Sequence, residues 1–251
     1  MNQALQAVIA KYDFITCRVP QFVPSGISDL DAVTGGIPKG RIIDVYGGED
    51  AGKSALALAL AKGNTLLLDA ECKLAPSMAR CGLYVMHPET LEDALNICRM
   101  AAVGFNTVIV DSLEALPLKP EQERPLMDFF LEYGDEYKKT REQLLSKALP
   151  VLSMELLACG CTLIVVNQLL DRDGVIYGNP EYSTGGRALP YYASVRLLVS
   201  RIEHIMKRGQ VTGQIVKVSV VKHRFGQCFG SAKLALDYHT GRLCSRKEAL
   251  V

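Results

Sequence analysis

The chain has 251 residues, 49% of them hydrophobic and 22% charged, with a formal net charge of +1. That composition is enough for a core in one large domain or two small ones, so the chain should fold by itself. It contains no run of eighteen uncharged apolar residues and no charged-then-apolar leader, so we expect no membrane span, no secretory signal and a cytoplasmic location.

The charge is unevenly distributed along the chain. Residues 196–251 contain eleven Lys and Arg against three Asp and Glu, a balance of +8, which leaves −7 for residues 1–195. Two interpretations remain open: a solvated basic surface, or a surface that meets phosphate or an acidic neighbouring subunit.

The cysteines are scattered, and no pair has the C-x-x-C spacing of a structural zinc site. Most lie within apolar segments, so we expect buried free thiols and no metal beyond the one that a nucleotide brings. The eight are Cys17, Cys72, Cys81, Cys98, Cys159, Cys161, Cys228 and Cys244.

Residues 1–24 are predicted to form an arm rather than a domain, with an amphipathic helix over residues 1–11 and a strand over residues 14–17. Residues 25–251 would form the core. Ser28, followed three residues later by Asp31, indicates a helix start. The glycine-rich segment 35–40 is predicted to be a turn that leads into a strand over residues 41–46.

Strand and helix patterns alternate after residue 47, which indicates a largely parallel sheet covered by helices. A charged helical stretch over residues 125–157 follows, which Pro150 should break or kink. The predicted fold is α/β: a mostly parallel twisted sheet flanked by helices, with carboxyl-terminal antiparallel hairpin strands that extend it. The other predicted helices are residues 53–61 and 91–102, and the predicted strands are residues 65–69, 107–111, 162–167, 195–202, 214–221 and 232–238.

The segment GGEDAGKS, residues 47–54, has the spacing G-x-x-x-x-G-K-[ST] of a phosphate-binding loop, between a predicted strand and a predicted helix. Glycines there let backbone N–H groups converge on phosphate oxygens at the positive end of the helix. The alternative is an ordinary glycine turn. Lys53 would hold the β and γ phosphates of the nucleotide, and Ser54 would ligate Mg²⁺. The expected nucleotide-binding residues are Gly47, Gly48, Glu49, Asp50, Ala51, Gly52, Lys53, Ser54 and Ala55.

Two carboxylates follow other predicted strands. Asp111 ends the strand TVIVD and is a candidate second anchor for the metal, although it could instead cap the next helix. Glu71, in LLLDAE, lies just past another strand and is a candidate for orienting or deprotonating water. Ligands bind at the carboxyl edge of parallel sheets, where both residues would lie.

Six segments follow one another along most of the chain, from about residue 23 to residue 238. They are VPSGISDLDAVTGGIPKGRIIDVYGGEDAGKS, LLLDAE, VIVDS, VVNQ, YGNPEYSTGGRALPYYASVRL and VKVSVVKHR. In order and character they resemble the RecA-type recombinases of bacteria, and the stretch ALPYYASVR is the most specific. The resemblance implies a RecA-like P-loop NTPase core that forms a helical filament on single-stranded DNA, with ATP and Mg²⁺ bound between neighbouring subunits.

The resemblance also implies roles for individual residues. Lys53 and Ser54 hold phosphate and Mg²⁺, Asp111 is the second acidic motif, and Glu71 is the general base. Gln168 senses the γ-phosphate and passes the signal to the DNA-binding loop that follows it. Lys222 and Arg224, which from the residues alone would be solvated strand ends, reach the ATP of the adjacent subunit. Tyr191 is an aromatic interface residue.

The chain departs from the family in two places near these sites. Ala75 and Met78 replace the family's adenine-gripping Asp and Tyr, although Met78 can still pack on a base. The loop over residues 169–184 carries Asp171 and Asp173, and carboxylates repel DNA phosphates, so we expect weakened DNA binding. Candidate DNA contacts are Arg172, Tyr177 and Arg187.

Two further departures concern larger segments. Residues 121–142 carry seven acidic side chains against four basic ones, which favours a charged helix with an apolar face over a base-stacking segment. We expect no counterpart of the family's carboxyl-terminal DNA-gathering domain and an abbreviated amino-terminal arm. Residues 1–17 still offer a helix and a strand for docking on a neighbour, so a homo-oligomer, filament or ring, is expected.

Three hypotheses share this nucleotide site. The first is an ATP-dependent recombinase that assembles on single-stranded DNA, hydrolyses ATP at subunit interfaces and acts in homologous recombination and DNA repair. The alternative is an ATP-binding paralogue that regulates or partners another recombinase without strong DNA binding or strand exchange. A hexameric helicase or clock-type ATPase is disfavoured by the ALPYYASVR segment.

Overall fold

The computed structural model describes residues 20–119, 134–171, 181–183, 186–226 and 228–246. The helix and strand expected over residues 1–17, and most of the acidic segment 121–142, therefore lie outside the described residues. So do Arg172, Asp173 and Tyr177 of the candidate DNA-binding loop.

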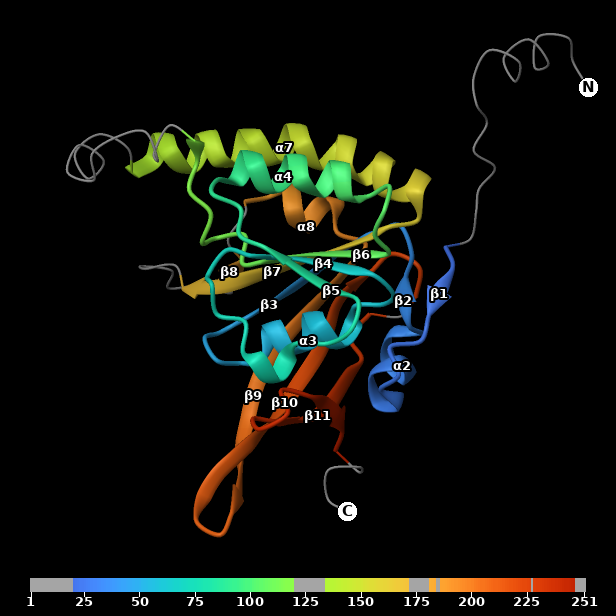
Figure 1. Cartoon of the computed structure of the whole chain (residues 1–251), viewed down its shortest axis with the longest axis vertical. Helices are drawn as coiled ribbons and strands as arrows, with labels where there is room; N and C mark the ends of the chain where they lie inside the picture. Colours follow the sequence, from blue (N-terminus) through green and yellow to red (C-terminus); the bar gives the residue numbers. More distant parts are fainter. Residues whose placement is uncertain (1–19, 120–133, 172–180, 184–185, 227, 247–251) are drawn as a thin grey trace, which may run out of the picture.

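One twisted sheet runs through the molecule (Figure 1), in the strand order β12-β11-β10-β9-β3-β7-β6-β4-β5, with β8 paired to β7. Its central strands are parallel and nearly all their side chains are buried, as expected for apolar runs covered on both faces. These strands are β3 (Ile42–Gly47), β4 (Thr65–Asp69), β6 (Thr107–Asp111) and β7 (Thr162–Asp171). The parallel strand β5 (Leu83–Met86) forms the edge of the sheet and is mostly exposed. The predicted α/β fold is confirmed.

The carboxyl-terminal strands extend the same sheet in antiparallel pairs, as predicted. They are β9 (Val195–Lys207), β10 (Gln210–His223), β11 (Ser231–Asp237) and β12 (Leu243–Ser245). The first two are longer than expected, and their hairpin extends beyond the helices at the bottom of Figure 1. β9 runs parallel to β3 and thereby joins the two halves of the sheet.

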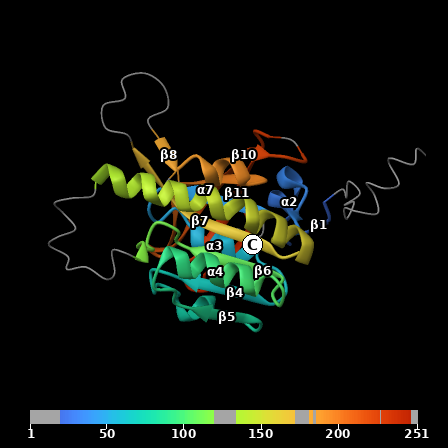
Figure 2. The same cartoon turned by 90° about the horizontal axis from the view of Figure 1, so that it is seen from above.

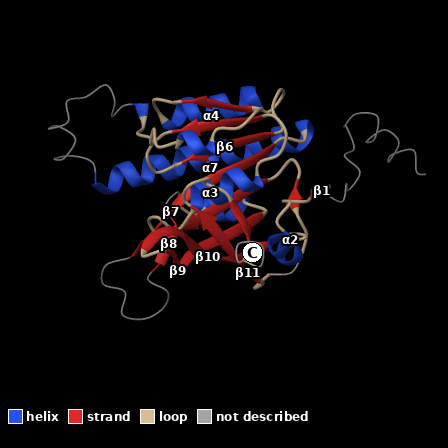
Figure 3. Ribbon diagram, turned by 60° about the horizontal axis from the view of Figure 1, so that its bottom comes forward, coloured by secondary structure: helices blue, strands red, loops and turns tan. Residues whose placement is uncertain are grey.

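Helices cover both faces of the sheet. On one face α4 (Leu91–Ala101) and α7 (Gly134–Cys159) lie side by side (Figures 1 and 2), with the short α8 (Ala188–Tyr192) beneath them. On the other face α3 (Lys53–Leu60) packs against the central strands and β12, and α2 (Ser28–Thr34) lies beside β11 (Figure 3). Each face has its own apolar core, so the sheet separates two buried layers.

Of the break or kink predicted at Pro150, the break was wrong, because α7 continues through that residue. Pro150 removes one helical hydrogen bond, at a cost of about 3 kcal/mol. Leu145, Leu149, Leu152 and Leu156 recur on one face of α7 and are all fully buried. Since each buried leucine contributes about 1.5–3 kcal/mol, packing of this face outweighs the lost bond.

The predicted helix start is confirmed, because α2 begins at Ser28, although the hydroxyl of that residue does not cap the helix. Instead the Asp31 carboxylate accepts hydrogen bonds from the backbone N–H groups of Ser25 (2.7 Å) and Gly26 (3.2 Å). The predicted turn over residues 35–40 contains a short strand, β2 (Ile37–Pro38), which pairs with β1 (Phe22–Val23). Residues 22–26, just before α2, are thus held in place by Asp31 and by pairing with β2.

The loop expected directly after Gln168 begins as strand. β7 continues to Asp171 and pairs with β8 (Glu181–Ser183), so the first and last residues of that loop form a hairpin. The burial predicted for the cysteines was wrong for Cys72, Cys81 and Cys159, which are exposed because they lie in loops or at a helix end. Of the helices in the described part of the chain, none is long and apolar enough to cross a membrane.

A buried ion pair joins β3 to β9. Asp44 is fully buried, and its Oδ2 lies 2.7 Å from Nε of Arg196, whose guanidinium also lies over the Tyr46 ring, 4.5 Å from its centroid. Oδ1 of Asp44 has no hydrogen-bond partner among the described residues, and burial raises the pKa of this carboxyl despite Arg196. Arg196 therefore contributes most to stabilising the charged form of Asp44, and the charge of Lys222 contributes less.

Replacing Arg196 with Met should lower the free energy of unfolding by about 3–5 kcal/mol, because a buried carboxylate loses its partner. Urea denaturation followed by circular dichroism measures this. The matched control is Arg99→Met, which breaks the exposed Arg99–Glu155 pair and should cost less than about 1 kcal/mol. Equal losses in the two variants would contradict the importance of the buried pair.

Candidate nucleotide site

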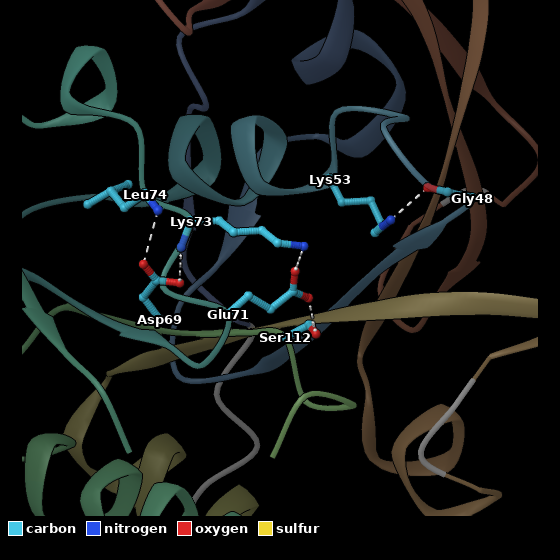
Figure 4. Close-up of polar contacts among 7 residues, drawn as sticks. All are labelled: Gly48, Lys53, Asp69, Glu71, Lys73, Leu74 and Ser112. Atoms are coloured by element: carbon cyan, nitrogen blue, oxygen red, sulfur yellow. Dashed lines mark hydrogen bonds and ion pairs between the residues drawn. The ribbon is translucent and has the colours of Figure 1, made fainter. Parts of the chain in front are cut away.

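The segment GGEDAGKS forms a loop between β3 and α3, as its spacing predicts. A Cβ atom at Gly47 would overlap the carbonyl oxygen of Val199 on β9, so only glycine fits there. Asp50 and Gly52 adopt positive φ angles of 51° and 93°, which turn the chain into the helix. Nζ of Lys53 donates a 2.6 Å hydrogen bond to the carbonyl oxygen of Gly48 within the loop (Figure 4).

A side chain from β10 supports this loop. Nε2 of Gln214 donates to the carbonyl oxygen of Asp50 at 2.9 Å, and the side chain is buried. Gln214 was not predicted, because its partner lies 164 residues away and no local pattern marks it.

Ser54 and Asp111, the predicted metal pair, are adjacent. Asp111 ends β6, and the Ser54 side chain forms a hydrogen bond with its carboxylate. Burial raises the pKa of Asp111, while Ser54 and the nearby Lys53 favour its charged form. Residues 112–115 form turns, so Asp111 caps no helix there. A hydroxyl and a carboxylate oxygen in contact are ligands that suit Mg²⁺.

Glu71 lies just past β4, next to the segment that follows Asp111. Oγ of Ser112 donates to Oε1 of Glu71 at 2.6 Å, and Nζ of Lys73 lies 2.7 Å from Oε2 (Figure 4). These two hydrogen bonds hold the pKa of Glu71 below its usual range, and the bond from Lys73 has the larger effect. Asp69 fixes the turn, because its carboxylate accepts from the backbone N–H groups of Lys73 and Leu74. No role was predicted for Asp69, Lys73 or Ser112.

Gln168 lies beside the phosphate loop. On β7 it is in register with Gly47 on β3, and the strand then continues into the β7–β8 hairpin. β7 thus pairs with the first glycine of the loop and leads into the segment that contains the candidate DNA contacts. Of these, only Arg187 is described; it is exposed and directly precedes α8.

Lys222 and Arg224 lie at the other edge of the sheet. Lys222 on β10 pairs with Arg196 on β9, which in turn pairs with Asp44 on β3. Asp44 precedes Gly47 by three residues, so Lys222 lies roughly 10 Å from Gly47 along the strand direction. Neither is a freely solvated strand end: Nζ of Lys222 donates to the carbonyl oxygens of Pro190 (2.7 Å) and Tyr191 (2.9 Å), and Arg224 donates to Tyr191 (2.7 Å). The exposed Tyr191 side chain stands beside them, 66% accessible.

His223, between these two cations, is buried and holds both ring nitrogens in hydrogen bonds. Nε2 lies 2.9 Å from the carbonyl oxygen of Thr34, and Nδ1 accepts from the N–H of Phe225 at 3.2 Å. The ring also stacks on Phe22. These contacts anchor the end of β10 to the end of α2, and sequence reasoning missed them because Thr34 is 189 residues away.

Met78, the candidate adenine contact, ends a 3-10 helix (Pro76–Met78) and is half-buried. It packs on the α3-side core and against Gly241, where a Cβ atom would lie 2.8 Å from its Cγ. Its role toward a base stays a prediction.

Comparison with known proteins identifies the family. The model of the RecA N-terminal domain matches residues 8–243. The chain belongs to the RecA family. It is 38% identical over 245 residues to Protein RecA of Salinispora arenicola (strain CNS-205), covering 91% of this chain and 68% of that protein. It is 37% identical over 235 residues to Protein RecA of Clostridium botulinum (strain Eklund 17B / Type B), covering 87% and 64%.

A third relative, Protein RecA of Bifidobacterium breve, is 37% identical over 237 residues, covering 88% of this chain and 59% of that protein. The chain thus spans roughly 59–68% of the length of these RecA relatives. The predicted family is confirmed, and the match includes the phosphate loop, the β7–β8 hairpin and the end of β10.

Proposed function

We propose that this RecA-family chain is a DNA-dependent ATPase that assembles on single-stranded DNA in the cytoplasm and acts in homologous recombination and DNA repair. The observation that carries the proposal is the division of the charged groups between two edges of the sheet. Lys53, Glu71 and Asp111 gather at the carboxyl edge, while Lys222 and Arg224 lie at the other. A second copy of the chain would bring the two sets together around one nucleotide.

At the carboxyl edge, the backbone of residues 47–55 would cradle the phosphates of ATP. Lys53 would exchange its bond to Gly48 for phosphate oxygens, and Ser54 and Asp111 would hold Mg²⁺. When bound, Mg²⁺ supplies positive charge that polarises the phosphate oxygens. Glu71 would orient the attacking water and accept its proton through a carboxylate oxygen.

From the neighbouring copy, Lys222 and Arg224 would leave the carbonyl groups at the end of α8 and contact the terminal phosphate. Two charges delivered across an interface act as an arginine finger does, so hydrolysis would depend on assembly into a filament or ring. Gln168, beside Gly47, would transmit the state of the phosphate to the β7–β8 hairpin, with Arg172, Tyr177 and Arg187 as candidate DNA contacts. Asp171 and Asp173 would weaken that contact by repulsion.

Single-stranded DNA should stimulate ATP hydrolysis by at least roughly tenfold, because assembly delivers the cations that an isolated subunit lacks. The measurement is the steady-state rate with and without DNA at increasing salt. Stimulation should fade as salt rises, because the logarithm of the affinity for single-stranded DNA falls with the logarithm of the salt concentration. The slope is roughly −0.7 for each phosphate contact. DNA-independent turnover, or none despite ATP binding, would contradict the proposal and support a paralogue that regulates another recombinase.

A further inference from the structure

Glu71 already forms an ion pair with a cation of the same chain. Nζ of Lys73 lies 2.7 Å from Oε2, and Ser112 donates to Oε1 at 2.6 Å, so both carboxylate oxygens accept hydrogen bonds (Figure 4). A general base needs an oxygen directed at water, and a carboxylate held by a cation is a weaker base. Lys73 therefore opposes the role proposed for Glu71.

The backbone turn over residues 69–74 places the Lys73 side chain beside Glu71. Asp69, a buried residue at the end of β4, accepts hydrogen bonds from the N–H groups of Lys73 (3.2 Å) and Leu74 (3.0 Å). Cys72 has a positive φ of 53°, which reverses the chain between Glu71 and Lys73. The turn thus brings the two charged side chains together, while Ser112 holds the other carboxylate oxygen of Glu71 and Nδ1 of His87 lies 2.8 Å from the carbonyl oxygen of Asp69.

The contact is also easily broken. The Lys73 side chain is 78% exposed and that of Glu71 22%, and ion pairs so close to solvent change an equilibrium constant by about fivefold at most. The ammonium group can move into water without any change of fold. A nearby positive charge would favour that movement by repulsion.

We propose that Lys73 is a positioning residue that restrains Glu71 in the isolated subunit and is displaced when a neighbouring copy brings Lys222 and Arg224 to the nucleotide. The inference rests on the proposed function, because it concerns the same Glu71. Lys73 thereby keeps hydrolysis slow before assembly. The arriving cations contact the terminal phosphate and repel Lys73, so that Glu71 is free to orient water.

The first test is Lys73→Met, with kcat and KM measured without DNA and with saturating single-stranded DNA. Without DNA, kcat should rise about two- to fivefold, the limit for such a pair, while KM stays unchanged. With DNA the rise should vanish, since the restraint is already displaced. Lys73→Arg should keep the low rate. The matched control is Lys39→Met, which removes an exposed lysine from the turn before β3. An unchanged or lower kcat in Lys73→Met would overturn the inference.

A second measurement does not depend on hydrolysis. The Glu71 carboxyl carbon of the nucleotide-free protein can be titrated by ¹³C NMR. The pKa of Glu71 should be higher in Lys73→Met than in the wild type or in Lys39→Met. Lys53 and Asp111, the other charged groups near this carboxylate, are the same in all three proteins. An unchanged titration would refute the restraint even in an active ATPase, whereas a raised pKa in a protein without ATPase activity would refute only the proposed function.

Discussion

Replacing Lys53 with Ala should lower kcat for ATP hydrolysis by roughly 10³-fold, because the variant loses the cation that would stabilise charge on the transferred phosphoryl group. In the structure Nζ of Lys53 donates a hydrogen bond to the carbonyl oxygen of Gly48, and the charges of Asp111 and Glu71 favour its charged form. The rate of phosphate release with saturating single-stranded DNA measures the effect.

The matched control for this variant is Lys39→Ala, an exposed lysine outside the loop, which should keep the wild-type rate. Both variants should unfold at the temperature of the wild type, because neither lysine side chain is part of the buried core. Turnover by Lys53→Ala within tenfold of the wild type would mean that the loop is not the hydrolytic site.

Replacing Arg224 with Ala should remove assembly-dependent hydrolysis, by roughly 10³-fold, while isolated subunits still bind ATP. The reason is that Arg224 lies at the edge of the sheet opposite its own phosphate loop, so its loss affects only the nucleotide of a neighbour. ATP affinity of the monomer and DNA-stimulated turnover are the two measurements. Arg242→Ala, which removes an exposed arginine between β11 and β12, is the control.

Mixing the two inactive proteins sharpens this test. An equal mixture of Lys53→Ala and Arg224→Ala subunits should regain activity at about a quarter of its interfaces, where an intact Lys53 meets an intact Arg224 from the next copy. No recovery from co-assembled subunits would argue against a shared site. A monomer that hydrolyses ATP normally without Arg224 would refute it.

Features that depend on a short stretch of sequence were predicted well. The phosphate loop and the position of Asp111 at the end of a buried strand follow from local spacing and apolar runs, and the structure confirms both positions. The parallel sheet followed from alternation of strand and helix patterns.

Features decided by distant partners were not predicted. β5 and β12 have only four and three residues, and their strand character comes from the neighbours they pair with. Gln214 and His223 gain their roles from backbone atoms of Asp50 and Thr34, which no pattern around either residue indicates. Pro150 was misjudged because tertiary packing of α7 outweighs a local helix breaker.

The strand β10 connects the two halves of the proposed interface. Near its start Gln214 holds the phosphate loop of its own chain, and near its end Lys222 precedes the residues that would face a neighbour. Lys222 lies eight residues after Gln214, which is roughly 26 Å of extended strand. In an assembly of identical copies, the length of β10 would therefore help to set the distance from one nucleotide to the next. Inserting a residue into β10 would alter the spacing and turn Lys222 to the opposite face of the sheet.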